Sequence, residues 1–157
     1  MSTKKTSKSE LYEQCQKEIT KKIGNKTLIE RMDFLCQLFK AKIPYYFWVD
    51  FYFPKDEHLE LGPSKGPSAC SQISYTGVCG KVAETGKPVI VPDVNRFPGH
   101  VACDPRSKSE IALPVFGVNE KVVAVFDVDS DERESFDETD LKWLQKILKQ
   151  AFTEIKP

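Results

Sequence analysis

Residues 111–129, IALPVFGVNEKVVAVFDVD, predict an antiparallel hairpin. Two runs rich in β-branched and aromatic residues, 111–116 and 121–129, flank turn-forming residues at 117–120. Side chains alternate between the two faces of a strand, so the even-numbered positions from Val122 to Val128 share one face, and Asp127 and Asp129 lie on the other. The hairpin therefore sets two carboxylates side by side at the end of an otherwise apolar strand face.

A third acidic residue, Glu110, begins the first strand of this hairpin. The turn at 117–120 brings that end of the strand near Asp127, so three carboxylates are expected to converge. Like charges at short distance repel, and a bound cation such as an ammonium group or a metal relieves the repulsion. The alternative is that the two aspartates form an ordinary solvated strand end.

Helices are expected at both ends of the chain. Apolar positions four apart predict a first helix over 9–23, and a Thr27-x-x-Glu30 capping box opens a second helix with an apolar stripe that reaches Ile43. A last helix begins at Asp137 and has a buried face that extends to Ile155.

Short strands and one short helix fill the middle of the sequence. Strands are expected over 45–53, 58–61 and 89–91, with an extended stretch over 69–74 and a loop over 62–68. Thr76 is expected to cap a short helix over 77–85 that Gly86 ends. A long irregular stretch, 92–109, follows, and loops of that length are usually functional.

These elements define an α+β fold with a central antiparallel sheet. The N- and C-terminal helices are expected on one face of the sheet, and a loop-built pocket on the other. Residues 1–9 are expected to be a disordered tail, and 10–157 a single domain, because 157 residues suit one full-sized core.

The composition excludes several classes of protein. Lys plus Arg and Asp plus Glu both number 23, whereas a nucleic-acid-binding protein normally has a basic excess. The longest aliphatic–aromatic run, 122–126, is far shorter than the about 20 residues that span a membrane. The N-terminal residues lack the apolar stretch of a secretory signal, so a cytoplasmic location is expected. In that compartment the five cysteines are expected to be thiols.

The cysteines fall into two groups. Cys15 and Cys36 lie on the apolar stripes of the first two helices and are interpreted as core residues. Cys70, Cys79 and Cys103 lie in segments rich in glycine, proline or serine, which suggests redox chemistry or metal binding.

Two further interpretations concern these three thiols. If Thr76 caps the short helix, backbone N–H groups and the positive helix end stabilise a Cys79 thiolate; alternatively, Cys79 packs inward. A zinc site of His100, Cys103 and the other two thiols is disfavoured, because no closely spaced ligand pair such as C-x-x-C is present.

Trp48 and Tyr52 are four residues apart on an expected strand and therefore share a face. They are interpreted either as core residues or as the wall of a small-molecule pocket, where aromatic faces suit a cationic or methyl-bearing group.

Together these residues resemble the free methionine-R-sulfoxide reductase family, whose members are built on a single GAF domain. Generic GAF domains lack this combination of cysteines and acids. The resemblance covers roughly 48–140 and rests on these motifs: Leu61-Gly62-Pro63, Ala69-Cys70, Gly77-Val78-Cys79-Gly80, Asp93-Val94, Gly99-His100-Val101-Ala102-Cys103-Asp104, Ser107-Lys108-Ser109-Glu110-Ile111, Leu113-Pro114 and Asp127-Val128-Asp129-Ser130.

The resemblance implies a role for each candidate residue. Cys103 is implied as the nucleophile and Cys70 as the thiol that resolves its sulfenic acid, with Cys79 as the alternative reactive thiol. Trp48 and Tyr52 match the aromatics that hold the S-methyl end of the substrate. The acids around the sulfoxide and the amino group are Glu110, Asp127 and Asp129.

Two positions depart from the family pattern. Asp50 stands where the family usually has glycine in a Trp-x-Gly-Phe-Tyr strand. The stretch between Cys70 and Cys79 is one residue shorter than usual and lacks the usual proline, which bears on where the Cys70 loop lies.

The implied activity is reduction of free L-methionine-(R)-sulfoxide to methionine through a sulfenic acid and an intramolecular disulfide. The implied partners are this substrate and thioredoxin as reductant, in a homodimer, with no metal, organic cofactor, nucleic acid or membrane. A non-catalytic GAF sensor of oxidants or small molecules is the alternative from another class, and a reductase of peptide-bound sulfoxide is the enzymatic alternative.

Overall fold

The computed structural model describes residues 6–67, 70–100 and 103–153. The strands form one six-stranded sheet in the order β3-β2-β1-β6-β5-β4, and every neighbouring pair is antiparallel. The expected α+β fold with a central antiparallel sheet is confirmed. The elements in chain order are α1 (Lys8–Lys22), α2 (Leu28–Lys42), β1 (Trp48–Pro54), β2 (Leu59–Lys65), β3 (Gln72–Ile73), α3 (Val78–Thr85), β4 (Val89–Val91), the 3₁₀ helix η1 (Val94–Arg96), β5 (Ser109–Phe116), β6 (Val122–Ser130) and α4 (Glu138–Phe152).

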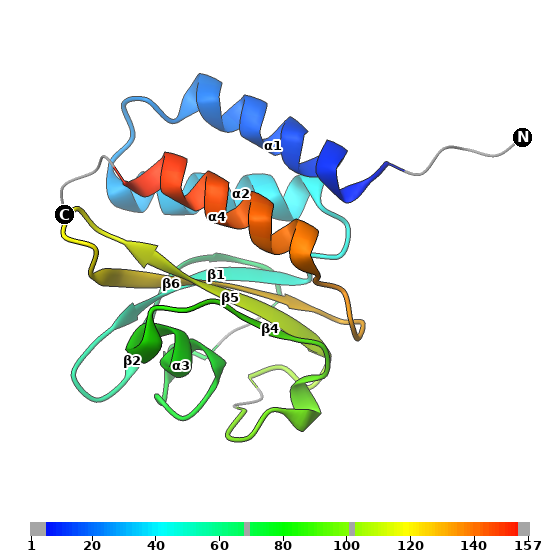
Figure 1. Cartoon of the computed structure of the whole chain (residues 1–157), viewed down its shortest axis with the longest axis vertical. Coiled ribbons are helices and arrows are strands. Elements are labelled where there is room, and N and C mark those ends of the chain that lie inside the picture. Colours follow the sequence, from blue (N-terminus) through cyan, green and yellow to red (C-terminus); the bar gives the residue numbers. More distant parts are fainter. Residues whose placement is uncertain (1–5, 68–69, 101–102, 154–157) are drawn as a thin grey trace, which may run out of the picture.

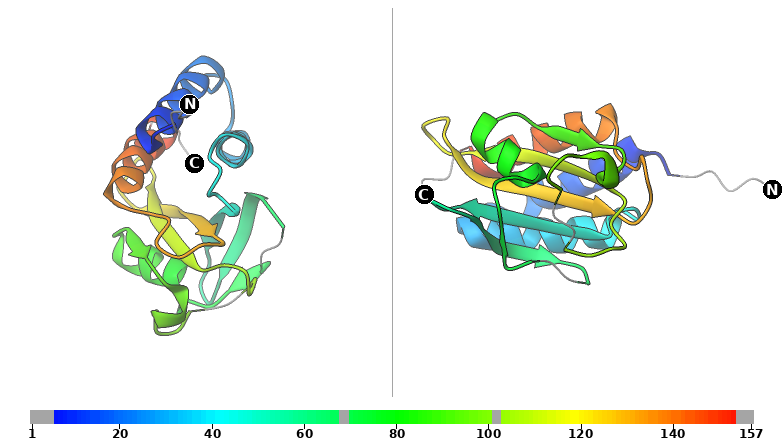
Figure 2. Two further views of the ribbon diagram at one scale, coloured as in Figure 1. Left: turned by 90° about the vertical axis from the view of Figure 1, so that its right-hand side faces the viewer. Right: turned by 90° about the horizontal axis from the view of Figure 1, so that it is seen from below.

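α1, α2 and α4 lie on one side of the sheet, opposite α3 and the loops (Figures 1 and 2). α2 packs on β1 and β2, and α4 packs on β5. α1 lies outside these two helices and contacts both, so the helical side has two layers (Figure 1). α3 and the segment between β4 and β5 occupy the other side.

The helix ends follow the local capping signals. Thr27 and Glu30 form the expected capping box of α2, and Asp137 forms one with Asp140 in α4. α1 begins at Lys8, one residue earlier than expected, because the Ser7 side chain accepts a hydrogen bond from the Glu10 N–H. Residues 1–5 of the expected tail, and Ile155 of the last helix, lie outside the described residues.

Two apolar clusters hold the layers together. The larger one lies between the sheet and the helices and includes Phe39, Phe51 and Phe126. The smaller one lies under α3 and includes Tyr52, Cys79 and residues of β4, β5 and β6. The two faces of β6 therefore alternate between two cores, as the hairpin pattern predicts for its central positions.

Two strand predictions are wrong. The first strand begins at Trp48, not at Tyr45, and the expected loop over 62–68 is strand as far as Lys65. Pairing of Lys65 with Val49 and of Ser64 with Asp50 explains the second error, because tertiary pairing overrides the weak strand propensity of Gly, Pro and Ser.

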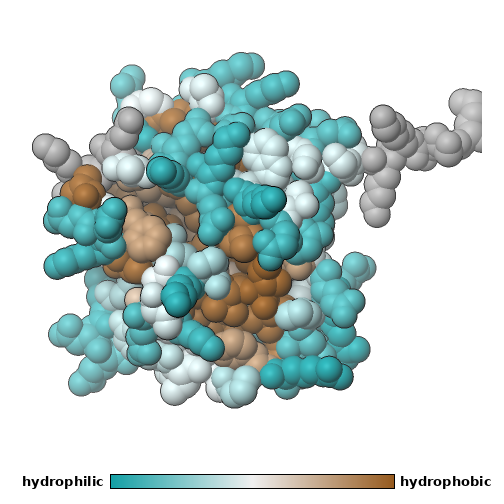
Figure 3. All heavy atoms as spheres, viewed as in Figure 1, coloured by the Kyte–Doolittle hydropathy of each residue, from teal (hydrophilic) through white to brown (hydrophobic). Residues whose placement is uncertain are grey.

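In the part of the chain that the structure describes, no helix combines the length and apolar character that a membrane span needs. An apolar surface lies beside α4, over β4 and β5 (Figure 3). There Phe116 and Val118 are 43% and 48% exposed, and a groove runs along Leu113, Phe116 and Leu148. This surface is on the helical side of the sheet, away from the pocket described next.

Candidate active site

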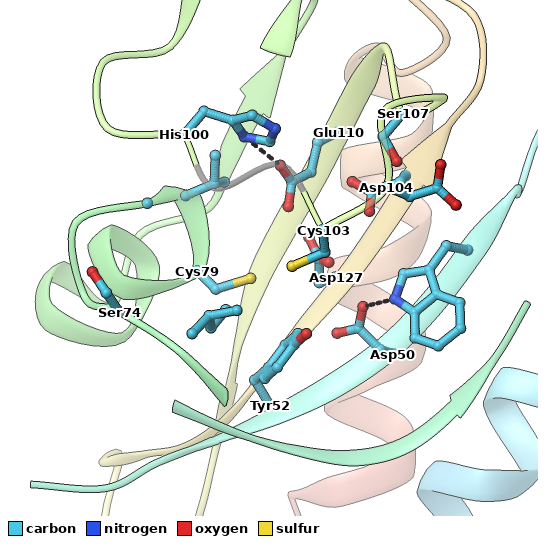
Figure 4. Close-up of a pocket in the computed structure, with 15 residues that line it drawn as sticks. Asp50, Tyr52, Ser74, Cys79, His100, Cys103, Asp104, Ser107, Glu110 and Asp127 are labelled. Atoms are coloured by element: carbon cyan, nitrogen blue, oxygen red, sulfur yellow. Dashed lines mark hydrogen bonds and ion pairs between the residues drawn. The ribbon is translucent and has the colours of Figure 1, made fainter. Parts of the chain in front are cut away.

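A small cavity of about 40 Å³ lies between the sheet and α3 (Figure 4). Every site residue predicted from the sequence lines it except Cys70, which is bonded to one that does. β1 contributes Trp48, Asp50 and Tyr52; α3 contributes Cys79; the segment before β5 contributes His100 and Cys103; β5 and β6 contribute Glu110, Asp127 and Asp129.

Strand pairing brings the acids together. β1 and β5 lie on either side of β6, and the register sets Asp50 opposite Asp127 and Glu110 opposite Asp129. Directly opposed residues in an antiparallel pair share a face. The expected convergence of Glu110, Asp127 and Asp129 therefore occurs, and β1 adds a fourth carboxyl group.

Three of these acids are short of hydrogen-bond donors. Asp50, Glu110 and Asp127, named here the Asp127 cluster, are 0%, 5% and 3% exposed. One oxygen of each, Asp50 Oδ1, Glu110 Oε1 and Asp127 Oδ1, has no donor. The carboxyl groups of Asp50 and Glu110 both contact that of Asp127, and two carboxyls in contact can bond only if one holds a proton.

The electrostatics agree with this geometry. Burial, and then the charge of Asp127, raise the pKa of Asp50 and that of Glu110 well above their ordinary values. Burial and Asp127 also raise the pKa of Asp129, against a hydrogen bond from Ser107. The pocket therefore favours protonated carboxyls, or a bound cation that lets them ionise.

No full positive charge among the cavity-lining residues offsets these acids. His100 Nδ1 lies 3.9 Å from Glu110 Oε1, but burial lowers the pKa of the imidazole, which favours its neutral form. Arg106 binds Asp104 through two hydrogen bonds of 2.7 and 3.0 Å. A ligand cation is the missing countercharge.

Cys70 and Cys103 form a disulfide, with Cα atoms 5.4 Å apart. Cys70 lies just before β3, and the Tyr52 hydroxyl donates to its carbonyl oxygen at 2.8 Å. The two thiols that the resemblance pairs therefore lie together despite the shortened loop. Cys15, Cys36 and Cys79 are free and buried.

The expectation of a stabilised Cys79 thiolate is wrong. Gly77, not Thr76, is the N-cap of α3, and no side chain caps the helix. Burial, Asp127 and Glu110 raise the pKa of the Cys79 thiol well above its ordinary value. Gly80 allows this helix to sit tightly on the preceding segment, because a Cβ there would lie 2.1 Å from the Tyr75 carbonyl oxygen. The inward-packing alternative describes Cys79 better.

In the disulfide form, Cys70 and Cys103 are bonded to each other and are not available as zinc ligands. A different set, the Cys79 sulfur with one carboxylate oxygen each of Glu110 and Asp127, lies within 4.8 Å of one another. These atoms are close enough to bind one metal ion. All three residues line the cavity, so an ammonium group bound there would also lie near the two carboxylates.

Asp50 lines the cavity, and sequence reasoning did not place it there. It was noticed only as a departure from a family pattern. The alternation rule contained the signal, because Asp50 lies midway between Trp48 and Tyr52 and so shares their face.

Comparisons with known proteins identify the family to which the chain belongs. A model of the GAF domain matches residues 31–152, so the chain belongs to the GAF domain family. The free methionine-R-sulfoxide reductase of Neisseria meningitidis, solved in complex with its substrate, is 33% identical, with 97% of this chain and 94% of that chain covered and a TM-score of 0.86. Within the GAF domains, the chain is therefore a member of the free methionine-R-sulfoxide reductase family.

Curated relatives match a shorter segment. "GAF domain-containing protein A" of Dictyostelium discoideum is 50% identical over 106 residues, 66% of this chain and 66% of that protein. The free methionine-R-sulfoxide reductase of Saccharomyces cerevisiae is 42% identical over 106 residues, 65% and 59% of the two chains. The chain thus spans slightly less than two thirds of the length of these relatives.

Proposed function

We propose that this protein reduces free L-methionine-(R)-sulfoxide to methionine. The observation that carries the proposal is the pairing, in one cavity, of a redox-capable cysteine with buried acids that are short of donors. A sulfoxide needs a sulfur nucleophile and a proton donor, and a free amino acid brings an ammonium group. Family membership supports the same reaction.

Cys103 is the proposed nucleophile, since it lines the cavity and is joined to a second cysteine. Its thiolate attacks the sulfur of the sulfoxide, and the oxygen passes with a proton to the cysteine. The substrate sulfur is reduced to the thioether of methionine, and Cys103 is oxidised to a sulfenic acid.

Glu110 is the proposed acid. The sulfoxide oxygen accepts electron density as the S–O bond breaks, so a donor that is neutral at working pH assists the step. Burial and Asp127 keep the Glu110 carboxyl protonated by raising its pKa. One protonated carboxyl, that of Glu110, is sufficient to give a proton to the sulfoxide oxygen.

Cys70 is the proposed resolving thiol. It condenses with the Cys103 sulfenic acid, which forms the disulfide and releases water before further oxidation can trap the sulfur. An external dithiol, proposed to be thioredoxin, then exchanges with that disulfide and restores both thiols. Cys79 remains the alternative reactive thiol, and a Cys79→Ser variant that loses the first turnover would assign the attack to it.

Substrate selection follows from the lining. Asp127 and Asp129 are proposed to hold the α-ammonium, whose charge lets them ionise, and Trp48 and Tyr52 to contact the S-methyl group. With the disulfide closed, about 40 Å³ holds a few waters at most, so the substrate enters after reduction.

The test is methionine release from separated R and S isomers of the free sulfoxide, with dithiothreitol as reductant. We expect release from the R isomer alone, and far slower reaction of peptide-bound sulfoxide. Cys103→Ser should abolish even the first turnover, Cys70→Ser should keep the first turnover and slow recycling, and Cys15→Ala serves as the thiol control. No release from either isomer would favour a non-catalytic sensor instead.

The resemblance also supports a homodimer, which we include in the proposal together with a cytoplasmic location and a single domain over 10–157, to which the structure adds Lys8 and Ser9 of α1. Light scattering of the purified full chain measures the first of these directly.

A further inference from the structure

Asp50 is a fully buried acid held from two sides in the pocket. Its exposed fraction is 0%, and Trp48 Nε1 donates a hydrogen bond to its Oδ2 (dashed line at Asp50 in Figure 4). Its carboxyl also contacts Asp127, the residue directly opposite on β6. A side chain that is fully buried, and whose Oδ2 is held by Trp48, has little room to move when a ligand enters.

The position of Asp50 decides which part of a ligand it meets. It lies between Trp48 and Tyr52 on one face of β1, and these two are the largest side chains of a lining that also includes acids, sulfur and the smaller apolar residues Ile73 and Val78. The S-alkyl group is the apolar end of the substrate. It is therefore directed towards β1, where the Asp50 side chain forms the floor.

We propose that Asp50 is a specificity-determining residue that fills the floor between Trp48 and Tyr52 and limits the S-alkyl group of the substrate to methyl. The inference rests on the proposed function of this pocket. It assigns Asp50 a role through volume and fixed position. The role needs no charge on Asp50, because the volume of the side chain alone fills the floor while its Oδ2 accepts from Trp48 Nε1.

The chain offers a matched pair of variants. Asp50→Asn keeps the volume, an acceptor for Trp48 Nε1 and a donor towards Asp127. Asp50→Ala removes the side chain beyond Cβ and opens the floor. Asp50→Asn removes a buried acid that has an unpaired oxygen, whereas Asp50→Ala also leaves Trp48 Nε1 without its acceptor and should lower the free energy of unfolding.

The experiment compares kcat/KM for the R sulfoxides of free methionine and of its S-ethyl homologue. One methylene in a tight pocket is worth about 10- to 200-fold in discrimination. We expect that preference for methyl in the wild type and in Asp50→Asn, and at least a tenfold smaller preference in Asp50→Ala. A general loss of structure would lower both rates and leave their ratio unchanged.

Three results would overturn the inference. An Asp50→Ala variant with the wild-type ratio would show that the floor does not limit the alkyl group. A tenfold higher KM in Asp50→Asn for the methyl substrate would show that Asp50 acts as a charged partner of the ammonium group. Absence of turnover by the wild type would overturn the proposed function and this inference together, whereas either of the first two leaves the proposed function standing. If Asp50→Ala does not fold, Asp50→Ser provides the same opening with a small polar group.

Discussion

Buried acids lie on both sides of the sheet, and the two sides differ in whether the carboxyl oxygens have hydrogen-bond donors. On the helical side, Asp140 is 0% exposed and accepts hydrogen bonds from Tyr12, Tyr45, Lys8 and the Asp137 N–H at 2.5–2.8 Å. Tyr46 bonds to Tyr12 at 2.8 Å and completes this group, named here the Asp140 cluster. On the pocket side, the Asp127 cluster has three oxygens with no donor.

The difference separates structure from function. Buried polar groups that serve the fold are almost always satisfied within the protein, and an orphaned one requires an explanation. The Asp140 cluster ties α1, the segment between α2 and β1, and α4 together, and its acid is satisfied within the protein. The Asp127 cluster has three oxygens without a donor and no Lys or Arg beside it among the described residues of the cavity lining, so an ammonium group of a substrate can supply donors and charge, and a protonated carboxyl can donate to a sulfoxide oxygen.

The largest expected effect comes from Glu110→Gln. Glutamine keeps the size and a hydrogen-bond donor but has no acidic proton, so kcat should fall about 10²- to 10⁴-fold, the usual contribution of a general acid. The free energy of unfolding should stay the same or rise, because a buried acid is removed. Steady-state kinetics and urea unfolding of the same preparation check both. An active Glu110→Gln enzyme would remove Glu110 from the proposed mechanism.

Asp140→Asn should have the opposite profile. The amide keeps one acceptor oxygen, and its NH2 group faces the donors of the other side, either Tyr12 and Tyr45 or Lys8 and the Asp137 N–H, so buried hydrogen bonds are lost. We expect a loss of about 2–3 kcal/mol in the free energy of unfolding. The kcat of the folded enzyme should stay within about twofold, because no residue of this cluster lines the cavity. A large fall in kcat at full folding would break the division between the two clusters.

The sequence predicts the local features of the two clusters, such as which strand residues share a face, but not which strands and helices lie side by side. Alternation placed Asp127 and Asp129 on one face of a strand and Trp48 and Tyr52 on another, and the capping box placed the start of α2. It did not show that β1 lies beside β6, because strands far apart in sequence pair in an order that local patterns do not encode. Asp50 was therefore missed as a pocket residue.

The Asp140 cluster was missed for the same reason. Tyr12 and Asp140 are separated by 128 positions in the sequence. The tyrosine lies on an apolar stripe of the first helix, and the aspartate looks like an ordinary first-turn acid of the last one. Only packing of α1 against α4 brings the two together.

A third prediction concerns pH. The pKa of Glu110 is raised above the ordinary 4.5 by burial and by Asp127, so the folded protein keeps a proton that the unfolded chain loses. Stability is then greatest below the unfolded-state pKa and falls as pH rises through the interval up to the folded-state pKa. Urea unfolding between about pH 5 and about pH 8 should show this fall in the wild type.

The matched variant isolates the cause. In Glu110→Gln the fall in stability with rising pH should be smaller, whereas Asp140→Asn should keep the wild-type slope at lower overall stability. Identical slopes in the wild type and Glu110→Gln would mean that Glu110 is not protonated in the folded protein.

The smallest expected effects come from removing single hydroxyl groups. Two such groups are all that distinguishes Asp140 Oδ1 from the oxygens without donors in the pocket. Tyr12 and Tyr45 both donate to Asp140 Oδ1, while Lys8 and the Asp137 N–H donate to Oδ2. Tyr45→Phe leaves Oδ1 one donor and should cost about 1 kcal/mol, whereas Tyr12→Phe also removes the hydrogen-bond partner of buried Tyr46 and should cost about 2 kcal/mol. The double variant leaves Oδ1 none and should cost about 1 kcal/mol more than the sum, because the two residues share one acceptor. In the double variant Asp140 Oδ1 would have no donor, like the three carboxyl oxygens of the Asp127 cluster. Strict additivity in a double-mutant cycle would show that Asp140 finds another donor, and that a missing donor alone does not distinguish a binding site from a structural acid.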